Sequence, residues 1–167
     1  HMVCALVGPK RLDPWVIAAI VVGVALRFIN LGAAALWFDE TFSHYHSVTP
    51  WPDFLRVVVE DNQAPIYYTI LKAWSDVAGL SPWAMRVPGL VASAACIPLM
   101  AAITRVAAGD RPARAAAWLA AISPYLIQHA QDARPYALLS TFATIDLLLL
   151  VRFVTGHSAR LGVLWVL

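Results

Sequence analysis

Two adjacent carboxylates, Asp39 and Glu40, lie among aromatic residues in the segment 36–43 (LWFDETFS), shortly after the first long apolar run. A carboxylate beside a low-dielectric membrane binds its proton more tightly unless a cation or a hydrogen-bond donor faces it, which suits a general base or a metal ligand. Neighbouring helical residues point about 100° apart, so we expect the two carboxylates to have different tasks. The pair would equally form the acidic first turn of an ordinary amphipathic helix, which the helix dipole favours.

Two further polar clusters, 60–68 (EDNQAPIYY) and 128–136 (QHAQDARPY), lie next to apolar stretches. Acids, amides and tyrosines at such a boundary could bind a polar substrate. The plain alternatives are a loop that ends in a helix cap for the first cluster and a charge-compensated turn for the second. The candidate binding residues in the two clusters are Glu60, Asp61, Tyr67, Tyr68, Gln131, Asp132 and Arg134.

Three arginines, Arg27, Arg86 and Arg134, occur near the ends of apolar stretches, where a guanidinium could bind a lipid phosphate. Snorkelling of a long side chain toward the headgroups would explain any one of them as well. His44 and His46 have no third ligand at a spacing typical of zinc sites, and we interpret them as interfacial histidines.

The composition indicates which elements must position these residues. Hydrophobic residues make up 60% of the 167 positions and charged residues 13%, whereas about 25% of residues are charged in soluble domains. The formal net charge of +2 and the absence of a basic run argue against nucleic acid as a partner. Long apolar stretches joined by short charged segments are typical of helices that cross a bilayer.

We therefore predict an all-α fold, a polytopic membrane helix bundle that forms a single transmembrane domain over residues 1–167. Between its first two spans an external loop, 32–80, is expected to carry juxtamembrane amphipathic helices and a partly inserted helix over 65–80. The predicted spans are 14–31, 82–108, 113–130 and 136–154, and a truncated span begins at 161–167.

The distribution of basic residues predicts the orientation of this bundle, because Lys and Arg are enriched in cytoplasmic loops. If 65–80 does not cross, the loops after 108 and after 154 fall on the same side as Lys10 and Arg11. The acids at 39, 40, 60, 61 and 132 then all face outside.

Taken in order, these clusters resemble the GT-C glycosyltransferases that use polyprenyl-phosphate sugars, a group that includes protein O-mannosyltransferases and the aminoarabinose transferase of lipid A. The resemblance covers roughly residues 14–154. It departs from the family pattern at Gln63 and Ala64, where relatives often carry His and Pro, and in its length. The matching motifs are Trp37–Glu40 (Trp-x-Asp-Glu), 61–68 (DNQAPIYY), Arg86–Pro88 (Arg-x-Pro), Ser123-Pro124 and 131–137 (QDARPYA).

The resemblance implies a mechanism in which Asp39 deprotonates an acceptor hydroxyl that attacks the anomeric carbon, giving inversion. It also implies that Arg134, with Arg86 or Arg27, contacts the lipid phosphate. The other acids, Glu40, Glu60, Asp61 and Asp132, would orient the acceptor or hold a divalent cation such as Mg²⁺ or Mn²⁺.

The expected partners are a polyprenyl-phosphate-linked sugar, membrane lipid, and an acceptor that is a glycan, a lipid or a protein. The expected location is a bacterial inner membrane with the active site outside. We expect the 167-residue chain alone to be inactive, as the N-terminal part of such an enzyme. The alternatives are a non-catalytic lipid-phosphate-binding or assembly module and, less favoured, a transporter, because only Asp146 lies well within a predicted span.

Overall fold

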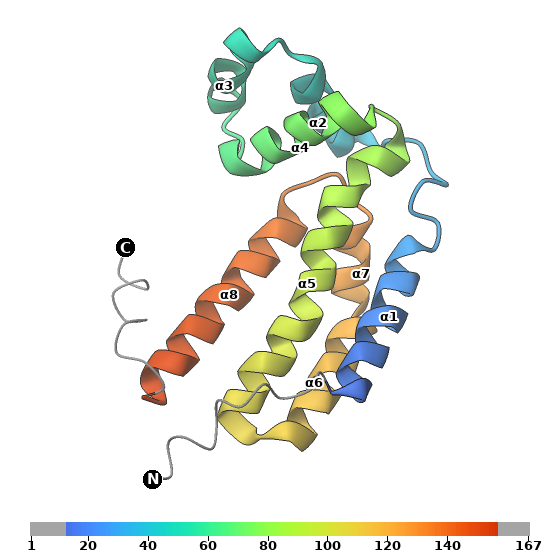
Figure 1. The fold of residues 1–167 in the computed structure, drawn as a ribbon. Helices are drawn as coiled ribbons and strands as arrows, with labels where there is room; N and C mark the ends of the chain where they lie inside the picture. Colours follow the sequence, from blue (N-terminus) through green and yellow to red (C-terminus); the bar gives the residue numbers. More distant parts are fainter. Residues whose placement is uncertain (1–12, 157–167) are drawn as a thin grey trace.

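The computed structural model describes residues 13–156, and within that range it contains eight helices and no strand. Five helices run alongside one another as a bundle, and the other three, α2 to α4, lie over one end of it; we call these three the cap (Figure 1). The predicted all-α membrane helix bundle is confirmed. The helices are α1 (Pro14–Phe28), α2 (Phe38–Val48), α3 (Trp51–Glu60), α4 (Pro65–Ala78), α5 (Pro82–Ala108), α6 (Asp110–Ala121), α7 (Pro124–Ala130) and α8 (Tyr136–Val154).

Two of the described helices, α5 and α8, are long and apolar enough to cross a membrane, with 27 and 19 residues. α1 is also apolar but has 15 residues, fewer than the predicted span 14–31. The stretch predicted as one span over 113–130 is built from α6 and α7, which are separated at residues 122–123. Residues 161–167 lie outside the described part, and the number of membrane crossings stays a prediction.

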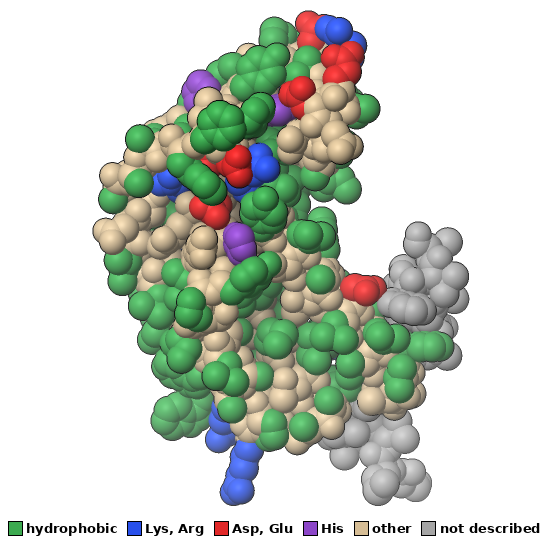
Figure 2. Space-filling view, turned by 180° about the vertical axis from the view of Figure 1, so that it is seen from behind, with side chains coloured by type: hydrophobic (Ala, Val, Ile, Leu, Met, Phe, Trp, Pro, Cys, Tyr) green, Lys and Arg blue, Asp and Glu red, His purple; other side chains and the backbone are tan. Residues whose placement is uncertain are grey.

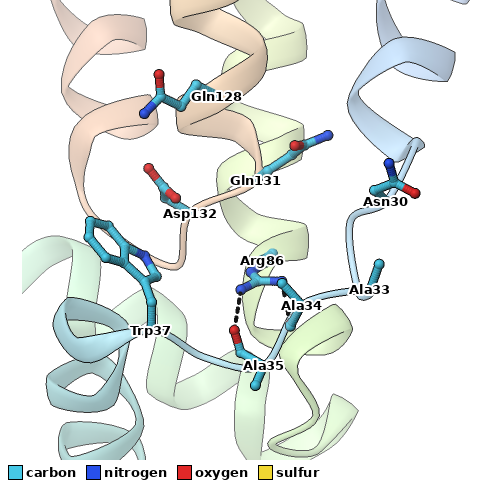
Figure 3. Close-up of a pocket in the computed structure, with 9 residues that line it drawn as sticks. All are labelled: Asn30, Ala33, Ala34, Ala35, Trp37, Arg86, Gln128, Gln131 and Asp132. Carbon is cyan, nitrogen blue, oxygen red and sulfur yellow. Dashed lines mark hydrogen bonds between the residues drawn. The ribbon is translucent and has the colours of Figure 1, made fainter.

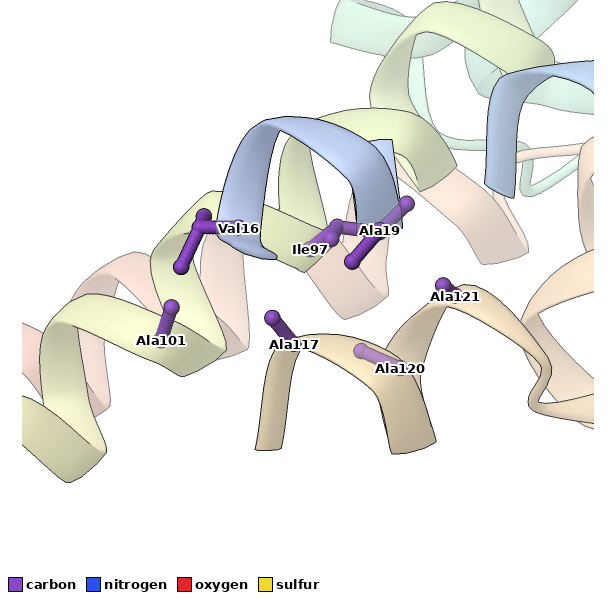
Figure 4. Packing of buried hydrophobic residues seen from close by; sticks show 7 residues of the cluster. All are labelled: Val16, Ala19, Ile97, Ala101, Ala117, Ala120 and Ala121. Carbon is purple, nitrogen blue, oxygen red and sulfur yellow. The ribbon is translucent and has the colours of Figure 1, made fainter. Parts of the chain in front are cut away.

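α1, α5 and α6 pack through small side chains (Figure 4). A Cβ on Gly23 of α1 would lie 3.1 Å from the Cα of Ala121 on α6, so the two backbones approach closely. Small residues allow this approach and are typical of helix contacts inside membranes. The buried cluster consists of Val16, Ala19, Ile97, Ala101, Ala117, Ala120 and Ala121.

A fully buried arginine, Arg27, stabilises the break between α6 and α7. Its guanidinium donates to the carbonyls of Ala120 (3.1 Å) and Ala121 (3.0 Å). The Ala120 carbonyl would normally accept from the residue four positions on, but that residue is Pro124, which has no N–H. Ser93 on α5 accepts a further bond from the Arg27 Nε at 2.9 Å. Arg27 therefore neither snorkels nor is free to bind a lipid phosphate, contrary to the sequence-based interpretations.

A second buried cluster joins the cap to the bundle. It consists of Phe54, Val58, Tyr67, Tyr68, Leu71, Met85 and Ala133, which come from α3, α4, the start of α5 and the turn before α8. α4 lies across the end of the bundle in Figure 1. Its Lys72 turns inward and donates to the carbonyl of Ser47 at 3.1 Å, with its Nζ 4.9 Å from the centre of the Trp51 ring. The partial membrane insertion of 65–80 stays a prediction.

The end of the bundle opposite the cap carries basic side chains, some of which are visible at the lower end of Figure 2. Arg105 and Asp110 form an ion pair with 2.9 Å between Nε and Oδ1, and Arg114 pairs with Asp13 at 2.7 Å. Lys10, Arg11 and Arg160 lie outside the described residues. The orientation of the bundle across the membrane stays a prediction.

We predict that the hydrogen bonds of Arg27 stabilise the bundle. Replacing Arg27→Ala leaves the carbonyls of Ala120 and Ala121 buried without their donors, so we expect the free energy of unfolding to fall by about 2–4 kcal/mol. Thermal unfolding in detergent would measure the loss. The matched control is Arg152→Ala in the last turn of α8, whose side chain forms no hydrogen bond or ion pair in the described part of the chain. Equal melting of the two variants would contradict this role of Arg27.

Candidate functional site

A buried ion pair between Glu40 and Arg86 lies where the cap meets the bundle. The Nη2 and Nε of Arg86 donate to the two carboxylate oxygens of Glu40 at 2.6 Å and 2.9 Å. Glu40 is completely buried and Arg86 is 5% exposed. Two parallel hydrogen bonds of this kind fix orientation as well as distance.

The remaining bonding capacity of this pair is used by the backbone of three other segments. The N–H groups of Ala133 (2.8 Å) and Trp37 (3.2 Å) donate to Glu40. Arg86 also donates to the carbonyls of Leu31 (2.8 Å), Ala34 (3.1 Å) and Ala35 (3.3 Å). The pair thus connects the loop after α1, the start of α2, α5 and the turn before α8.

These contacts argue for a positioning role for Glu40, in place of the catalytic role that the sequence suggested. Burial by itself would raise the pKa of the Glu40 carboxyl, but the bonds from Arg86, Ala133 and Trp37 outweigh burial and hold the pKa below its usual value. The carboxylate is therefore ionised, paired and closed to substrate. Arg86, which the sequence suggested as a phosphate ligand, has all five guanidinium N–H groups engaged with protein oxygens.

Asp39 faces different surroundings, as the helical spacing predicted. It is partly exposed in the first turn of α2, and within the described part of the chain no donor bonds its carboxylate. Its backbone carbonyl instead accepts from the Nη1 of Arg134 at 3.2 Å. Asp39 therefore has an ionisable oxygen pair that is open to an incoming group and fixed in place through the main chain.

Arg134 places a positive charge beside Asp39. Its Nη1 also donates to the hydroxyl of Tyr68 at 3.3 Å, and its buried Nε has no hydrogen-bond partner in the described part of the protein. Burial alone would lower the pKa of the Arg134 guanidinium, but interaction with Tyr136 and the charge of Asp39 raise the pKa above its usual value. Arg134 thus stays charged and has donor capacity to spare.

Tyr67 and Tyr68 are adjacent residues of α4, and the Tyr68 hydroxyl contacts this arginine. The Tyr68 hydroxyl donates to Gln63 at 3.1 Å, so the glutamine that departs from the family pattern has a structural partner here. The Tyr67 hydroxyl is buried and has no hydrogen-bond partner among the described residues. Burial raises the pKa of Tyr67 well above its ordinary value, so the hydroxyl remains a neutral donor.

The turn before α8 holds Gln131 and Asp132 against the bundle. The Gln131 amide donates to the carbonyls of Ile29 (2.7 Å) and Arg27 (3.3 Å), which caps the end of α1. Burial, followed by the negative charge of Glu40, raises the pKa of Asp132, and His129 offsets part of this rise with its Nδ1 3.4 Å from the carboxylate.

Glu60 and Asp61, the other predicted binding acids, form no hydrogen bond or ion pair with Glu40, Arg86 or Arg134. Glu60 is exposed at the end of α3, with 3.7 Å between its Oε1 and the Nη1 of Arg56. The Oδ2 of Asp61 lies 3.0 Å from the Nε2 of His46, although their geometry is not that of a hydrogen bond. No group of three or more His, Cys, Asp or Glu side chains in residues 13–156 is arranged to hold a metal ion.

Comparison with known proteins identifies the family. The family model described as dolichyl-phosphate-mannose-protein mannosyltransferase matches residues 62–167. The chain belongs to this mannosyltransferase family. No curated protein and no solved structure matches it. The predicted resemblance is confirmed, and the protein is a membrane glycosyltransferase of the mannosyltransferase type.

Part of the site lies within the stretch that matches the family model. The matched stretch contains Arg86, Asp132 and Arg134, whereas Asp39 and Glu40 precede it. The two acids are nevertheless bonded directly to matched residues, Glu40 to Arg86 and the main chain of Asp39 to Arg134. The acidic pair is therefore bonded to residues that lie within the matched stretch.

Sequence reasoning missed a cavity of about 650 Å³ on this face of the mannosyltransferase (Figure 3). Trp37 and the polar cluster 128–136, both noted in the sequence, contribute to its walls. Asn30, which lies just after α1 and has a left-handed backbone (φ 62°), was not identified from the sequence. The lining residues are Asn30, Ala33, Ala34, Ala35, Trp37, Arg86, Gln128, Gln131 and Asp132.

The two neighbouring acids should respond differently to neutral substitution. Glu40→Gln removes the charge that compensates buried Arg86, so we expect the free energy of unfolding to fall by about 3 kcal/mol. Asp39→Asn, the matched control, should change it by less than about 0.5 kcal/mol, because its carboxylate has no partner to lose. Chemical unfolding of the purified protein in detergent would measure both. Similar values for the two variants would argue against a special role for the Glu40–Arg86 pair.

Lowering the pH should reduce the difference in the free energy of unfolding between the Glu40→Gln variant and the unmodified protein. Because the folded pKa of Glu40 is depressed, its stabilisation is complete above the unfolded pKa of about 4.3 and is lost as the pH falls through the lower folded pKa.

Proposed function

We propose that this protein transfers a sugar from a polyprenyl-phosphate donor to an acceptor hydroxyl, with inversion, and that Asp39 is the general base. The observation that carries the proposal is the contrast between the two acids. The carboxylate of Glu40 is buried and bonded on both oxygens, whereas that of Asp39 is accessible, has no partner in the described part of the chain, and lies next to a charged arginine.

In the proposed reaction the acceptor hydroxyl donates its hydrogen bond to the Asp39 carboxylate. As the proton moves to Asp39, the hydroxyl oxygen forms a bond with the anomeric carbon from the face opposite the lipid phosphate. The bond between that carbon and the phosphate oxygen breaks, and its electron pair leaves with the phosphate. A positioned base contributes about 10²–10⁴-fold to such a step.

Arg134 is the residue we propose for the leaving phosphate. Its raised pKa keeps it charged, and its side chain is partly exposed beside Asp39. Charge that develops on the phosphate as the bond breaks would be stabilised by a fixed guanidinium.

Glu40 and Arg86 are proposed to position these groups and to touch no reacting atom. Through Ala133 and Trp37 the Glu40 carboxylate holds the segments that carry Arg134 and Asp39. Asp132 is proposed to orient the acceptor or the sugar. Because the described acids and histidines do not converge as metal ligands do, no step is assigned to Mg²⁺ or Mn²⁺.

We further propose that the cap faces the outside of a bacterial inner membrane. Arg105, Arg111 and Arg114 lie at the other end of the bundle, and Lys and Arg are enriched on the cytoplasmic side. The acceptor, whether glycan, lipid or protein, would then approach Asp39 from outside.

The role of Asp39 is tested with Asp39→Asn in the full-length protein in membranes, supplied with a panel of polyprenyl-phosphate sugars. We expect sugar transfer to fall by about 10²–10⁴-fold, because an amide cannot accept the proton. The matched control is Asp53→Asn in α3, an exposed cap residue paired with Arg56, which should retain full transfer.

Full transfer by the Asp39→Asn variant would overturn the assignment of the base. Retention of polyprenyl-phosphate binding by every variant, with no transfer by the unmodified protein from any donor of the panel, would instead favour the non-catalytic lipid-binding alternative.

A further inference from the structure

We propose that the cavity in front of Trp37 is a binding site for a pyranose ring. This inference rests on the proposed function, since it gives the transferred or the accepting sugar a place in this protein. The cavity has a volume of about 650 Å³ and is open at the junction of the cap and the bundle (Figure 3). Small-molecule sites in proteins have volumes of about 300–1,000 Å³.

Trp37 supplies one flat wall of the cavity. Its side chain is 53% exposed, although its main chain is fixed by bonds with Glu40 and Thr41. Figure 3 shows Asp132 beside the indole, and Asn30 and Ala33 on the other side of the view. An aromatic ring with one polar edge offers a flat apolar surface to the C–H groups of a sugar and leaves its N–H for a hydroxyl. An exposed tryptophan held on a rigid main chain therefore suits stacking against a ring.

Three amide side chains of the cavity have groups available for hydrogen bonding. The side chains of Asn30 and Gln128 form no hydrogen bond within the described part of the chain. Gln131 uses its amide nitrogen for the carbonyls at the end of α1, which leaves its oxygen. Each sugar hydroxyl donates one hydrogen bond and accepts others, so a set of amides that combines donors and acceptors is complementary to it.

The charges of the cavity favour a neutral ligand over an anion. The positive charge of Arg86 is cancelled by Glu40, and its donors are all used. The remaining acid on the wall is Asp132, whose carboxylate would repel a phosphate when ionised and accept from a hydroxyl. A neutral polyhydroxylated ring fits this set, whereas the phosphate would find its cation at Arg134.

The position of the cavity links it to the proposed chemistry. Trp37 is two residues before Asp39, and Asp132 is two residues before Arg134. Two residues span at most about 7 Å along the chain. The two segments that contribute Trp37 and Asp132 to the cavity are therefore the same segments that carry the proposed base and the proposed phosphate ligand.

Sugar binding can be measured without turnover, which separates this inference from the proposed base. Saturation-transfer NMR would use the full-length protein in detergent with the methyl α-glycosides of mannose, glucose and galactose as probes. We expect at least one probe to give signals with both the unmodified protein and Asp39→Asn. Absence of signals from all three probes with the unmodified protein would overturn the proposal.

Two substitutions test the walls of the cavity. Trp37→Leu removes the flat ring, and Gln128→Ala removes an exposed amide that no described residue contacts through a hydrogen bond, so the second variant should keep the fold. Each should weaken glycoside binding by about five- to tenfold. The matched control Trp15→Ala removes an exposed tryptophan at the opposite end of the bundle and should bind normally. Unchanged binding by both Trp37→Leu and Gln128→Ala would overturn the proposal.

Steady-state kinetics of the Gln128→Ala variant would identify the source of the ring. A rise in the KM for the polyprenyl-phosphate sugar, with the KM for the acceptor unchanged, would place the donor sugar in the cavity. A rise in the KM for the acceptor alone would place an acceptor sugar there. Unchanged KM values for both substrates would show that the cavity takes no part in the reaction, which would also overturn the proposal.

Discussion

The buried pair of Glu40 and Arg86 is the interaction on which the rest of the site depends. Removing two charges from water is costly, and the cost is recovered only when the geometry is good and the remaining hydrogen-bonding groups are satisfied. Both conditions hold here, because two N–H···O bonds join the side chains and five backbone groups complete the set. Loss of either partner would leave an uncompensated charge where four chain segments meet.

A second buried arginine, Arg27, also bonds backbone carbonyls within the bundle. Pro124 leaves the carbonyl of Ala120 without a helical donor, and Arg27 supplies one. The break that results ends α6 and lets the shorter α7 lead into the turn that carries Asp132 and Arg134. Gly89 of α5 lies against this turn, since a Cβ there would be 3.0 Å from the carbonyl of Asp132. Two buried arginines thus fix the path of the main chain that positions the site.

The sequence predicted the helical membrane bundle and the family because both depend on local patterns. The length of an apolar stretch and the order of short motifs can be recognised without knowledge of tertiary contacts. The role of Glu40 depends on Arg86, which is 46 residues away, and on the N–H of Ala133, and neither partner can be identified from composition or spacing. For the same reason the sequence suggested Arg27 and Arg86 as phosphate ligands, although their guanidinium groups bond protein oxygens in the folded chain.

The cavity and the separated acids illustrate the same limit. Asn30 and Gln128 gain meaning only when the end of α1 and α7 come together beside Trp37. Glu60 and Asp61 looked equivalent to Asp132, because all three were predicted on one side of the membrane. A shared side places groups within tens of ångströms, whereas chemistry needs contact. Local turns decide the rest: Asp61 ends beside His46, and Asp132 ends in the cavity wall.

Arg134 binds α2 without engaging the carboxylate of Asp39. A guanidinium bonded directly to the carboxylate of Asp39 would occupy the oxygens of that carboxylate. Arg134 bonds the main-chain carbonyl of Asp39 instead, and the bidentate partner on α2 is Glu40. One carboxylate of the adjacent pair thus provides the rigid attachment, and the other is partly exposed and has no hydrogen-bond donor in the described part of the chain. This division follows from the roughly 100° between successive helical residues, which allows one acid to face the interior while its neighbour faces the open surface.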